Sequence, residues 1–239
     1  MKFHYIAFII PLLFVFIGVE YYFSKKTNRK YFSFSSSISN ISIGIAERLA
    51  QLFCAGYFVL LFQFTHDHFA LFNVTENAFT WILIFVLTDL LWYWYHRSSH
   101  EVNILWGAHI VHHSSEEYNY TVSLRITIYQ SIVRILFGLL LPVIGFPVSM
   151  LLVSISVLGL YQFFLHTRFV RNLGFLEVFL VTPSNHRVHH GNNPIYLDKN
   201  FGGIFIIWDK LFGTYQAETE EVRYGLTKQV DSHSFLWLH

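Results

Sequence analysis

Long apolar stretches separated by short polar segments dominate the pattern along this chain. Three of them run from Phe3 to Phe23, from Gly44 to Phe64 and from Ala78 to Tyr95, and each contains few charged residues. Each approaches about 20 residues, the length of helix that crosses the hydrocarbon core of a bilayer. The pattern therefore predicts three membrane-spanning helices before the first polar cluster.

A fourth apolar region, from Ile135 to Leu165, contains no formally charged residue. At about 1.5 Å per residue it is too long for one straight span and short for two. Pro142, Gly145 and Pro147 interrupt its middle. We therefore expect a helical hairpin whose two ends lie on one side of the membrane.

The distribution of basic residues predicts the orientation. Four of them directly follow the first apolar stretch: Lys25, Lys26, Arg29 and Lys30. Lys and Arg are retained on the cytoplasmic side, so the linker 24–43 is expected there and the amino terminus outside. The loop from Thr65 to Asn77 has no Lys or Arg and is expected outside. No small-residue cleavage site follows the first stretch, which favours a retained anchor over a cleaved signal peptide.

The polar segments 96–125 and 166–239 are separated by the hairpin, so both must lie at one membrane face and can form one cap. The expected fold is an all-α integral membrane bundle of about four to five spans, including the hairpin, with a cytoplasmic histidine-rich cap. We expect one membrane-embedded domain over 1–239, in which 1–77 holds two N-terminal spans.

Composition narrows the class of protein. The chain is 54% hydrophobic, 19% aromatic and only 13% charged, whereas soluble domains are about 25% charged. This excludes a disordered chain and disfavours a free-standing soluble enzyme. A net charge of +1 gives no electrostatic footprint for nucleic acid. A single cysteine, Cys54, excludes an internal disulfide framework and a cysteine-ligated zinc or iron–sulfur site.

Fourteen histidines are the unusual feature, and eight of them form three clusters, at 96–100, 109–113 and 186–190. Positions i, i+3 and i+4 of a helix share a face, so each cluster is expected to point two or three imidazoles the same way. His166, which closes the hairpin on the same side, is a further candidate. The nine candidate metal ligands are His96, His100, His109, His112, His113, His166, His186, His189 and His190. The other five, His4, His66, His68, His233 and His239, are expected to be incidental.

The number of candidates indicates more than one ion, because a structural zinc takes four ligands and a catalytic zinc about three. The chain has no HExxH motif, which argues against the common zinc enzymes. Two iron ions in a nitrogen-rich shell, with positions open for oxygen, fit the count. Such a site in a membrane protein suggests oxidation of an unactivated C–H bond in a lipid.

Four segments resemble the fatty acid hydroxylase/sterol desaturase superfamily of membrane di-iron oxygenases: 89–100, 109–113, 186–190 and 191–215. The resemblance covers about residues 80–217, so 78–217 is expected to be the catalytic region. Within the superfamily, the segments 114–119 and 191–215 look most like the alkylglycerol monooxygenase branch. That branch hydroxylates the ether-linked carbon of glycerol ether lipids and uses tetrahydrobiopterin.

The resemblance implies that the nine histidines ligate a ferrous pair, which uses dioxygen to oxidise a membrane lipid. One oxygen atom enters the lipid and the other leaves as water. The chain has no GxGxxG motif and no cytochrome-type HPGG motif, so the two electrons are expected from a separate donor protein or a reduced pterin. The active site is expected on the cytoplasmic face of a bacterial inner membrane or of the endoplasmic reticulum.

Several polar residues near the clusters are candidates for supporting roles. Asp89 precedes His96 by two helical turns and is expected to orient a ligand histidine. Glu116 follows the second cluster. It is a candidate hydrogen-bond acceptor for a ligand or a contact for a cofactor or lipid headgroup, or else it belongs to a solvated acidic edge. Asn193 follows the third cluster and is a candidate partner for metal-bound water. Arg125 and Arg187 are expected to snorkel at the interface or to hold an anionic headgroup or a redox partner.

Three alternatives remain open at this stage. A desaturase would use the same iron site to remove two hydrogen atoms, and the sequence does not separate it from a hydroxylase. A histidine-rich metal transporter predicts ligands near mid-bilayer on discontinuous spans. A membrane haem protein needs only one or two axial histidines and leaves the clusters unexplained.

Overall fold

A computed structural model of the chain describes residues 4–228, with side chains described from Pro11 onward. Over this range the structure is helical, and its only extended pairing is an isolated antiparallel bridge between Leu180 and Phe205. The helices are α1 (His4–Lys26), α2 (Phe34–Phe69), α3 (Ala78–Glu101), α4 (Asn103–His113), η1 (Tyr120–Leu124), α5 (Ile128–Gly138), α6 (Leu140–Ile144), α7 (Val148–Leu165), η2 (Gly174–Val178), α8 (Pro183–His189) and α9 (Ile207–Leu211). The predicted all-helical fold is confirmed.

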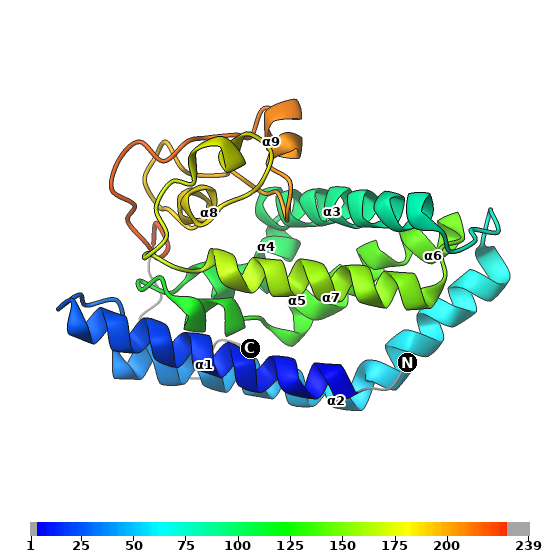
Figure 1. The fold of residues 1–239 in the computed structure, drawn as a ribbon, viewed down its shortest axis with the longest axis horizontal. Helices are drawn as coiled ribbons and strands as arrows, with labels where there is room; N and C mark the ends of the chain where they lie inside the picture. The colour runs from blue at the N-terminus through cyan, green and yellow to red at the C-terminus, as the bar shows by residue number, and fades with distance from the viewer. Residues whose placement is uncertain (1–3, 229–239) are drawn as a thin grey trace.

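Three helices of the described part, α2, α3 and α7, are long and apolar enough to cross a membrane. The chain is therefore a membrane protein. The expected count of four to five spans also included α1 and the broken pair α5 and α6, which are not among these three. Helix α3 packs against α4, α5 and α7 (Figure 1). It extends beyond the predicted end at Tyr95 to Glu101 and so carries the first histidine cluster.

Helix α2 begins earlier than the pattern predicted. The expected linker 24–43 is a short connection, 27–33, and residues from Phe34 onward are helical. Ser33 caps the helix by accepting a hydrogen bond from the Ser36 N–H at 3.3 Å. Gly44 lies so close to η1 that an added Cβ would be 2.9 Å from the Cβ of Leu124. Contact with η1 therefore stabilises the helix in a segment whose serines resemble a linker.

The predicted hairpin is present, with α5 and α6 as one arm and α7 as the other. Gly145 ends α6 in the left-handed region at φ 114°, where a side chain would be strained. The tip pairs with the α2–α3 connection, since the N–H of Leu71 donates to the carbonyl of Val143 at 2.8 Å. An added Cβ at Gly145 would be 1.8 Å from the carbonyl oxygen of Phe72. The hairpin thus reaches the same level as the loop that joins α2 to α3.

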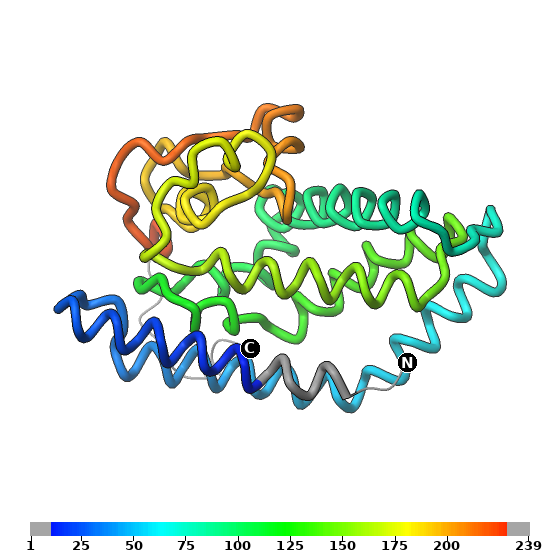
Figure 2. The backbone as a smooth tube through the Cα atoms, in the orientation of Figure 1, coloured from blue at the N-terminus to red at the C-terminus, as the bar shows by residue number. Residues whose placement is uncertain are grey.

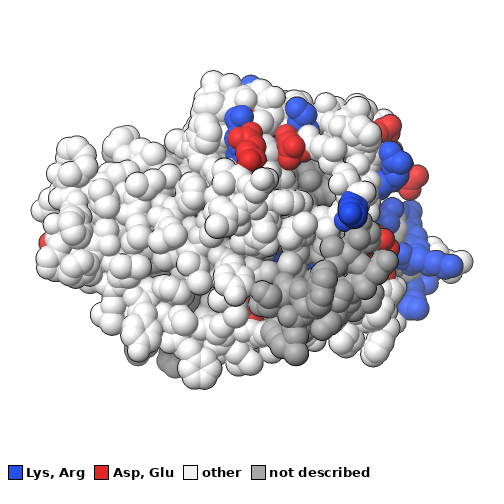
Figure 3. All heavy atoms as spheres, turned by 180° about the vertical axis from the view of Figure 1, so that it is seen from behind, with Lys and Arg blue, Asp and Glu red and all other residues white. Residues whose placement is uncertain are grey.

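Residues 166–228 form the cap, in which loops surround α8 and α9 at one end of the helices (Figure 2). Charged side chains gather at this end, whereas the opposite end is nearly free of them in the view from behind (Figure 3). The apolar core of the opposite half is built from side chains such as Ile84, Phe146 and Leu151. The molecule therefore has an apolar half and a polar half, with the hairpin ends at the junction.

Helix α1 is attached to this junction by a buried acid. The Glu20 carboxylate accepts hydrogen bonds from the Tyr120 N–H at 2.8 Å and from the Thr167 hydroxyl at 2.5 Å. The ring of Phe16 packs edge-on against Phe164 at the end of α7. Glu20 thus joins α1 to both sides of the hairpin.

Candidate metal centre

The structure brings all nine candidate histidines together in two groups. The five-histidine group contains His96, His100, His109, His113 and His189, and the four-histidine group contains His112, His166, His186 and His190. Within each group the ligand atoms lie within 4.8 Å of one another. Eight of the nine residues are buried and His100 is half-buried. These side chains come from α3, α4, α8 and the end of α7. The site therefore requires the cap to pack against the membrane helices.

The two HxxHH motifs are each divided between the groups. In 109–113 the first and fifth residues join the five-histidine group and the fourth joins the other. In 186–190 the assignment is reversed. The expectation of a shared direction is therefore correct for positions i and i+4 but not for i+3. The reason is that consecutive residues of a helix are about 100° apart around its axis, so positions i+3 and i+4 diverge.

Spacing of the imidazole nitrogens fits metal coordination. In the five-histidine group, Nε2 of His113 lies 3.2 Å from Nε2 of His109 and 3.1 Å from Nε2 of His189. In the four-histidine group, Nε2 of His166 lies 3.3 Å from Nε2 of His112 and 3.2 Å from Nε2 of His186. Nitrogens at about 2.1 Å from one ion, and about 90–109° apart, are separated by about 3.0–3.4 Å. Each group has the spacing of a ligand shell.

Two buried nitrogens support the same interpretation. Nε2 of His100 and Nε2 of His190 have no hydrogen-bond partner among the described residues. A buried polar atom normally has a partner, and a bond to a metal ion would satisfy it. The rings of His113 and His190 are stacked at 4.4 Å, so the two groups share a wall. The residues therefore fit two neighbouring metal ions.

Carbonyl groups orient the imidazoles of the five-histidine group. Nδ1 of His96 donates to the carbonyl of Phe201 at 2.9 Å, and Nδ1 of His189 donates to the carbonyl of Lys199 at 3.0 Å. A hydrogen on Nδ1 leaves the Nε2 lone pair free to bind a metal. The loop after α8 thus fixes both the direction and the tautomer of two ligands.

The four-histidine group is oriented from within the bundle. Nδ1 of His166 donates to the carbonyl of Gln162 at 2.8 Å, one turn back along α7. Nδ1 of His112 donates to the carbonyl of Arg125 at 3.3 Å. This group therefore depends on the hairpin and on η1, rather than on the loop after α8.

Burial keeps these imidazoles neutral. It lowers the pKa of His166 to about 4. Burial first, and repulsion by neighbouring imidazoles second, hold six further pKa values well below the ordinary value: those of His109, His112, His113, His186, His189 and His190. Neutral imidazole is the form that binds a metal ion, so the site is prepared for ligation at neutral pH.

Asp89 acts differently from the prediction. Its carboxylate accepts hydrogen bonds from the N–H groups of Ile204 at 2.6 Å and Phe205 at 3.0 Å, and from the indole of Trp208 at 2.9 Å. No hydrogen bond joins it to a histidine in the described part of the chain. Asp89 instead holds the loop whose Phe201 carbonyl orients a ligand.

A second carboxylate, which the sequence pattern did not single out, completes this support. Asp209 accepts hydrogen bonds from the N–H groups of Phe201 at 2.7 Å and Gly202 at 2.8 Å. An added Cβ on Gly203 would be 2.3 Å from Oδ1 of Asp89, so glycine is required there. The signal in the sequence that could have identified Asp209 is its position as the one acid in the apolar segment 204–212. Asp89 and Asp209 together form a two-carboxylate clamp around residues 201–205.

Glu116 and Asn193 are not placed at the imidazoles. The Glu116 side chain is exposed. Asn193 donates to the Glu220 carboxylate at 2.9 Å and accepts from the Arg223 N–H at 2.8 Å, so it fastens the tail to the cap. No hydrogen bond or ring contact joins either residue to a histidine among the residues described.

The two arginines expected at the interface are buried instead. Arg125 donates to the carbonyl of Val111 at 2.6 Å, to Ser114 at 2.9 Å and to Asn40 at 2.9 Å. Burial lowers the pKa of Arg125 to about 10, so it remains charged at neutral pH. Arg187 forms an ion pair with Glu218 at 2.6 Å. Snorkelling is therefore wrong for both.

The remaining histidines are outside both groups. His66 and His68 lie in the last turn of α2, at the hairpin-tip end of the molecule. The side chain of His4 is not described, and His233 and His239 lie outside the described residues.

Comparisons with known proteins agree with this geometry. A family model described as fatty acid hydroxylase matches residues 81–214. Alkylglycerol monooxygenase from Danio rerio is 42% identical over 206 residues, covering 86% of this chain and 46% of its own length. The protein of that name from Homo sapiens is 42% identical over 197 residues, covering 82% of this chain and 44% of its own.

A more distant relative is ornithine lipid hydroxylase OlsE from Rhizobium tropici, 29% identical over 139 residues, with coverage of 58% of this chain and 42% of its own length. No solved structure matches this chain. The chain spans less than half the length of these curated relatives. The family match and the two relatives at 42% identity confirm the resemblance expected from the histidine motifs: this chain belongs to the fatty acid hydroxylase family.

Proposed function

We propose that this chain is a membrane-bound lipid monooxygenase that uses two iron ions and dioxygen to hydroxylate an unactivated C–H bond. The observation that carries the proposal is the pair of buried histidine groups, whose facing Nε2 atoms lie 3.1 to 3.3 Å apart. The names of the relatives, alkylglycerol monooxygenase and ornithine lipid hydroxylase, support an oxygenase acting on lipid.

The five-histidine and four-histidine groups would each hold one ion. Imidazole ligands suit iron, copper and zinc, and the oxygenase relatives favour iron. Once bound, the iron pair supplies the chemistry of dioxygen activation, in which one oxygen atom enters the lipid and the other becomes water. The two electrons come from a separate donor, either a redox protein or a reduced pterin such as tetrahydrobiopterin.

The side chains of this protein contribute orientation, charge state and exclusion of water. The carbonyls of Phe201, Lys199, Gln162 and Arg125 fix four imidazoles with Nε2 directed into the site. Burial keeps the imidazoles neutral, so ligation requires no proton release from them. Eight of the nine ligands are buried, which limits access of water to a reactive centre.

Hydroxylation is favoured over the alternatives. The relatives carry hydroxylase and monooxygenase in their names, whereas desaturation would need the same site to remove two hydrogen atoms. A metal transporter would place its ligands on interrupted spans at mid-bilayer. Here α3 is continuous through His96 and His100, and the other ligands lie on α4, in the cap and at the hairpin end. A haem protein would not need nine imidazoles.

The position of the cap determines the side of the membrane on which the metal centre lies. We infer that the cap lies on the cytoplasmic face of a bacterial inner membrane or the endoplasmic reticulum. The inference is supported by the basic residues that follow α1 and by the charged cap. Cysteine labelling in intact vesicles tests it, with single cysteines in the loop 70–77 and in the tail 216–221. Labelling of both from the same side would contradict this topology.

Iron content and lipid product test the function. The full chain, purified in detergent and loaded with ferrous iron, should hold about two iron ions per chain. Incubation with an ether or acyl lipid, dioxygen and a reductant should add one oxygen atom to the lipid, measured by mass spectrometry. Loss of two hydrogens without added oxygen would identify a desaturase. An iron content near one would contradict the paired site.

A further inference from the structure

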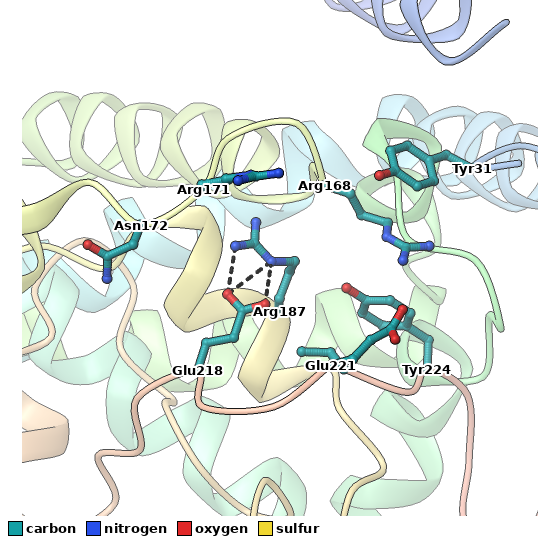
Figure 4. A pocket seen from close by; sticks show the side chains of 9 residues that line it. Tyr31, Arg168, Arg171, Asn172, Arg187, Glu218, Glu221 and Tyr224 are labelled. Atoms are coloured by element: carbon teal, nitrogen blue, oxygen red, sulfur yellow. Dashed lines mark hydrogen bonds and ion pairs between the residues drawn. The ribbon is translucent and has the colours of Figure 1, made fainter. Parts of the chain in front are cut away.

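A cavity of about 330 Å³ opens at the surface of the cap (Figure 4). Its walls come from the α1–α2 connection, the loop after α7, helix α8 and the segment 218–224. Three arginines line it, Arg168, Arg171 and Arg187, together with the carboxylates of Glu218 and Glu221. None of these residues belongs to either histidine group.

The guanidinium donors of Arg187 are occupied by other residues of the chain. It donates to both oxygens of Glu218, at 2.6 to 3.2 Å, and also to the carbonyls of Thr167 at 3.1 Å and Val170 at 2.6 Å. The dashed lines of Figure 4 mark its pairing with Glu218. This pair neutralises both charges, so the excess positive charge of the cavity comes from the other two arginines.

Arg168 is held in place without a hydrogen-bond acceptor. Its guanidinium lies between two rings, 4.3 Å from the centroid of Tyr31 and 5.4 Å from that of Tyr224, as Figure 4 shows. Neither Arg168 nor Arg171 forms a hydrogen bond or an ion pair with any described residue. Ring contacts fix the guanidinium plane but leave its N–H donors unused. Glu221 is the one other lining carboxylate, so the cavity holds two unpaired guanidinium groups and one further carboxylate.

Tyr118 separates the cavity from the metal centre. Its ring stacks on Tyr224 at 4.9 Å and on His166 at 5.6 Å, and only 1% of the residue is exposed. Its hydroxyl donates to the carbonyl of Leu165 at 3.0 Å, which fixes the ring. A molecule in the cavity therefore contacts Tyr224 but does not reach the ligand nitrogens. The cavity is a separate site and not the entrance for the reacting carbon.

We propose that this cavity binds a phosphate monoester group through Arg168 and Arg171. A guanidinium presents parallel donors that match two phosphate oxygens, and a phosphate has enough oxygens to occupy both arginines at once. The cavity volume falls in the range of about 300–1,000 Å³ typical of small-ligand sites, which leaves room for the organic part of the ester. The ester is either a lipid headgroup or a free metabolite. The proposal does not depend on the metal ions or on the reaction.

Calorimetric titration of the full chain tests the proposal, in a phosphate-free maltoside detergent. The probes are glycerol 3-phosphate, for a free ester, and a short-chain phosphatidic acid, for a headgroup. Arg168→Gln and Arg171→Gln should each weaken binding by about tenfold or more, because each removes a charge-assisted contact. Arg223→Gln is the matched control, since Arg223 is exposed, lies between the lining residues Val222 and Tyr224, and does not itself line the cavity. It should change affinity by less than about twofold.

The two probes distinguish the sources. Equal affinity for both identifies the phosphate group itself as the recognised feature, and binding of phosphatidic acid alone identifies a lipid headgroup. Binding of neither probe, or unchanged binding by both the Arg168 and Arg171 variants, would overturn the proposal. Circular dichroism and iron content measured on each variant show that the fold is retained, and Arg171 is exposed, so its replacement is expected to leave the fold intact.

Discussion

The two histidine groups differ in what holds their ligands in place. In the five-histidine group, two imidazoles donate to carbonyls of the loop after α8, and that loop is fixed by Asp89 and Asp209. In the four-histidine group, the corresponding carbonyls belong to α7 and to Arg125 beside η1. One group therefore depends on the cap loop and the other on the bundle.

The groups are nevertheless assembled together. Each HxxHH motif gives two ligands to one group and one ligand to the other, so neither α4 nor α8 builds a group alone. The two groups are therefore linked through the backbone of α4 and α8 but are supported independently. Damage to the cap loop should affect one group first, whereas removal of an imidazole should affect its own group directly.

Loss of a ligand gives the largest expected effect. His189→Ala should reduce metal binding in the five-histidine group, and His186→Ala should do so in the other, each lowering iron content from about two toward one per chain. Activity should fall by more than about a hundredfold in both, since even partners outside the ligand shell alter activity 10- to 100-fold. Iron analysis and lipid product measure this. A variant that retains both ions and full turnover would remove that histidine from the ligand set.

Acidification should lower the free energy of unfolding of the metal-free chain, because it acts on imidazoles of both groups. The pKa of His166 is about 4 in the folded chain and about 6.5 when unfolded, and six neighbouring imidazoles shift in the same direction. Between these values the unfolded chain binds more protons. The free energy of unfolding should therefore fall as pH drops below about 6.5 and continue to fall toward about 4.

Denaturant unfolding of the metal-free chain, at several values from about pH 7 to about pH 5, measures this dependence. The double variant His66→Gln with His68→Gln is the control, because both residues lie outside the groups. Its profile should superimpose on that of the original chain. A flat profile in the original chain would contradict the neutral state of the buried imidazoles.

Breaking the clamp should separate the two groups. Asp89→Asn weakens or removes acceptors for three donors of the cap loop. We expect iron affinity to fall by about 10- to 100-fold in the five-histidine group, with the four-histidine group nearly unchanged. Asp198→Asn is a milder comparison, because Asp198 is 66% exposed and lies 3.4 Å from Nδ1 of His100. It should cost at most about fivefold. Equal losses in both groups would refute their separate support.

A single methyl group gives the smallest effect. Gly203→Ala places a Cβ 2.3 Å from Oδ1 of Asp89, and such overpacking typically costs about 1–3 kcal/mol. Gly107→Ala is the matched control, because nothing lies within 4 Å of the added Cβ. It should be neutral or stabilise α4 by up to about 1 kcal/mol. Thermal unfolding in detergent compares them, and equal stability would show that the loop tolerates a shift at Gly203.

Sequence patterns identified what depends on local periodicity. The long α3, the hairpin interrupted near Gly145 and the nine histidines follow from hydrophobic runs, turn residues and i, i+4 spacing. The division of each HxxHH motif also follows from helical geometry, but it requires a partner that takes the diverging ring. That partner comes from a second motif about 77 residues away, and the pattern does not specify their relative placement.

Long-range polar contacts were not predictable in the same way. Asp89 pairs with the N–H of Ile204, 115 residues further along the chain, and Asn193 pairs with the tail rather than with the site. Arg125 is buried because Asn40, Ser114 and the Val111 carbonyl surround it, and these come from α2 and from the end of α4. In each case residue type indicated that a partner was needed, and only the fold determined which one.

Main-chain oxygens, rather than side chains, set the direction of four imidazoles in this protein. Any residue supplies such an oxygen, so this role places no demand on the side chain of Lys199. Substitution scanning at position 199 would therefore miss its contribution, whereas changes that displace the backbone, by insertion or by proline, would expose it. The orientation of these imidazoles is thus sensitive to the geometry of the backbone, although it leaves little trace in the identity of the amino acids that supply the carbonyls.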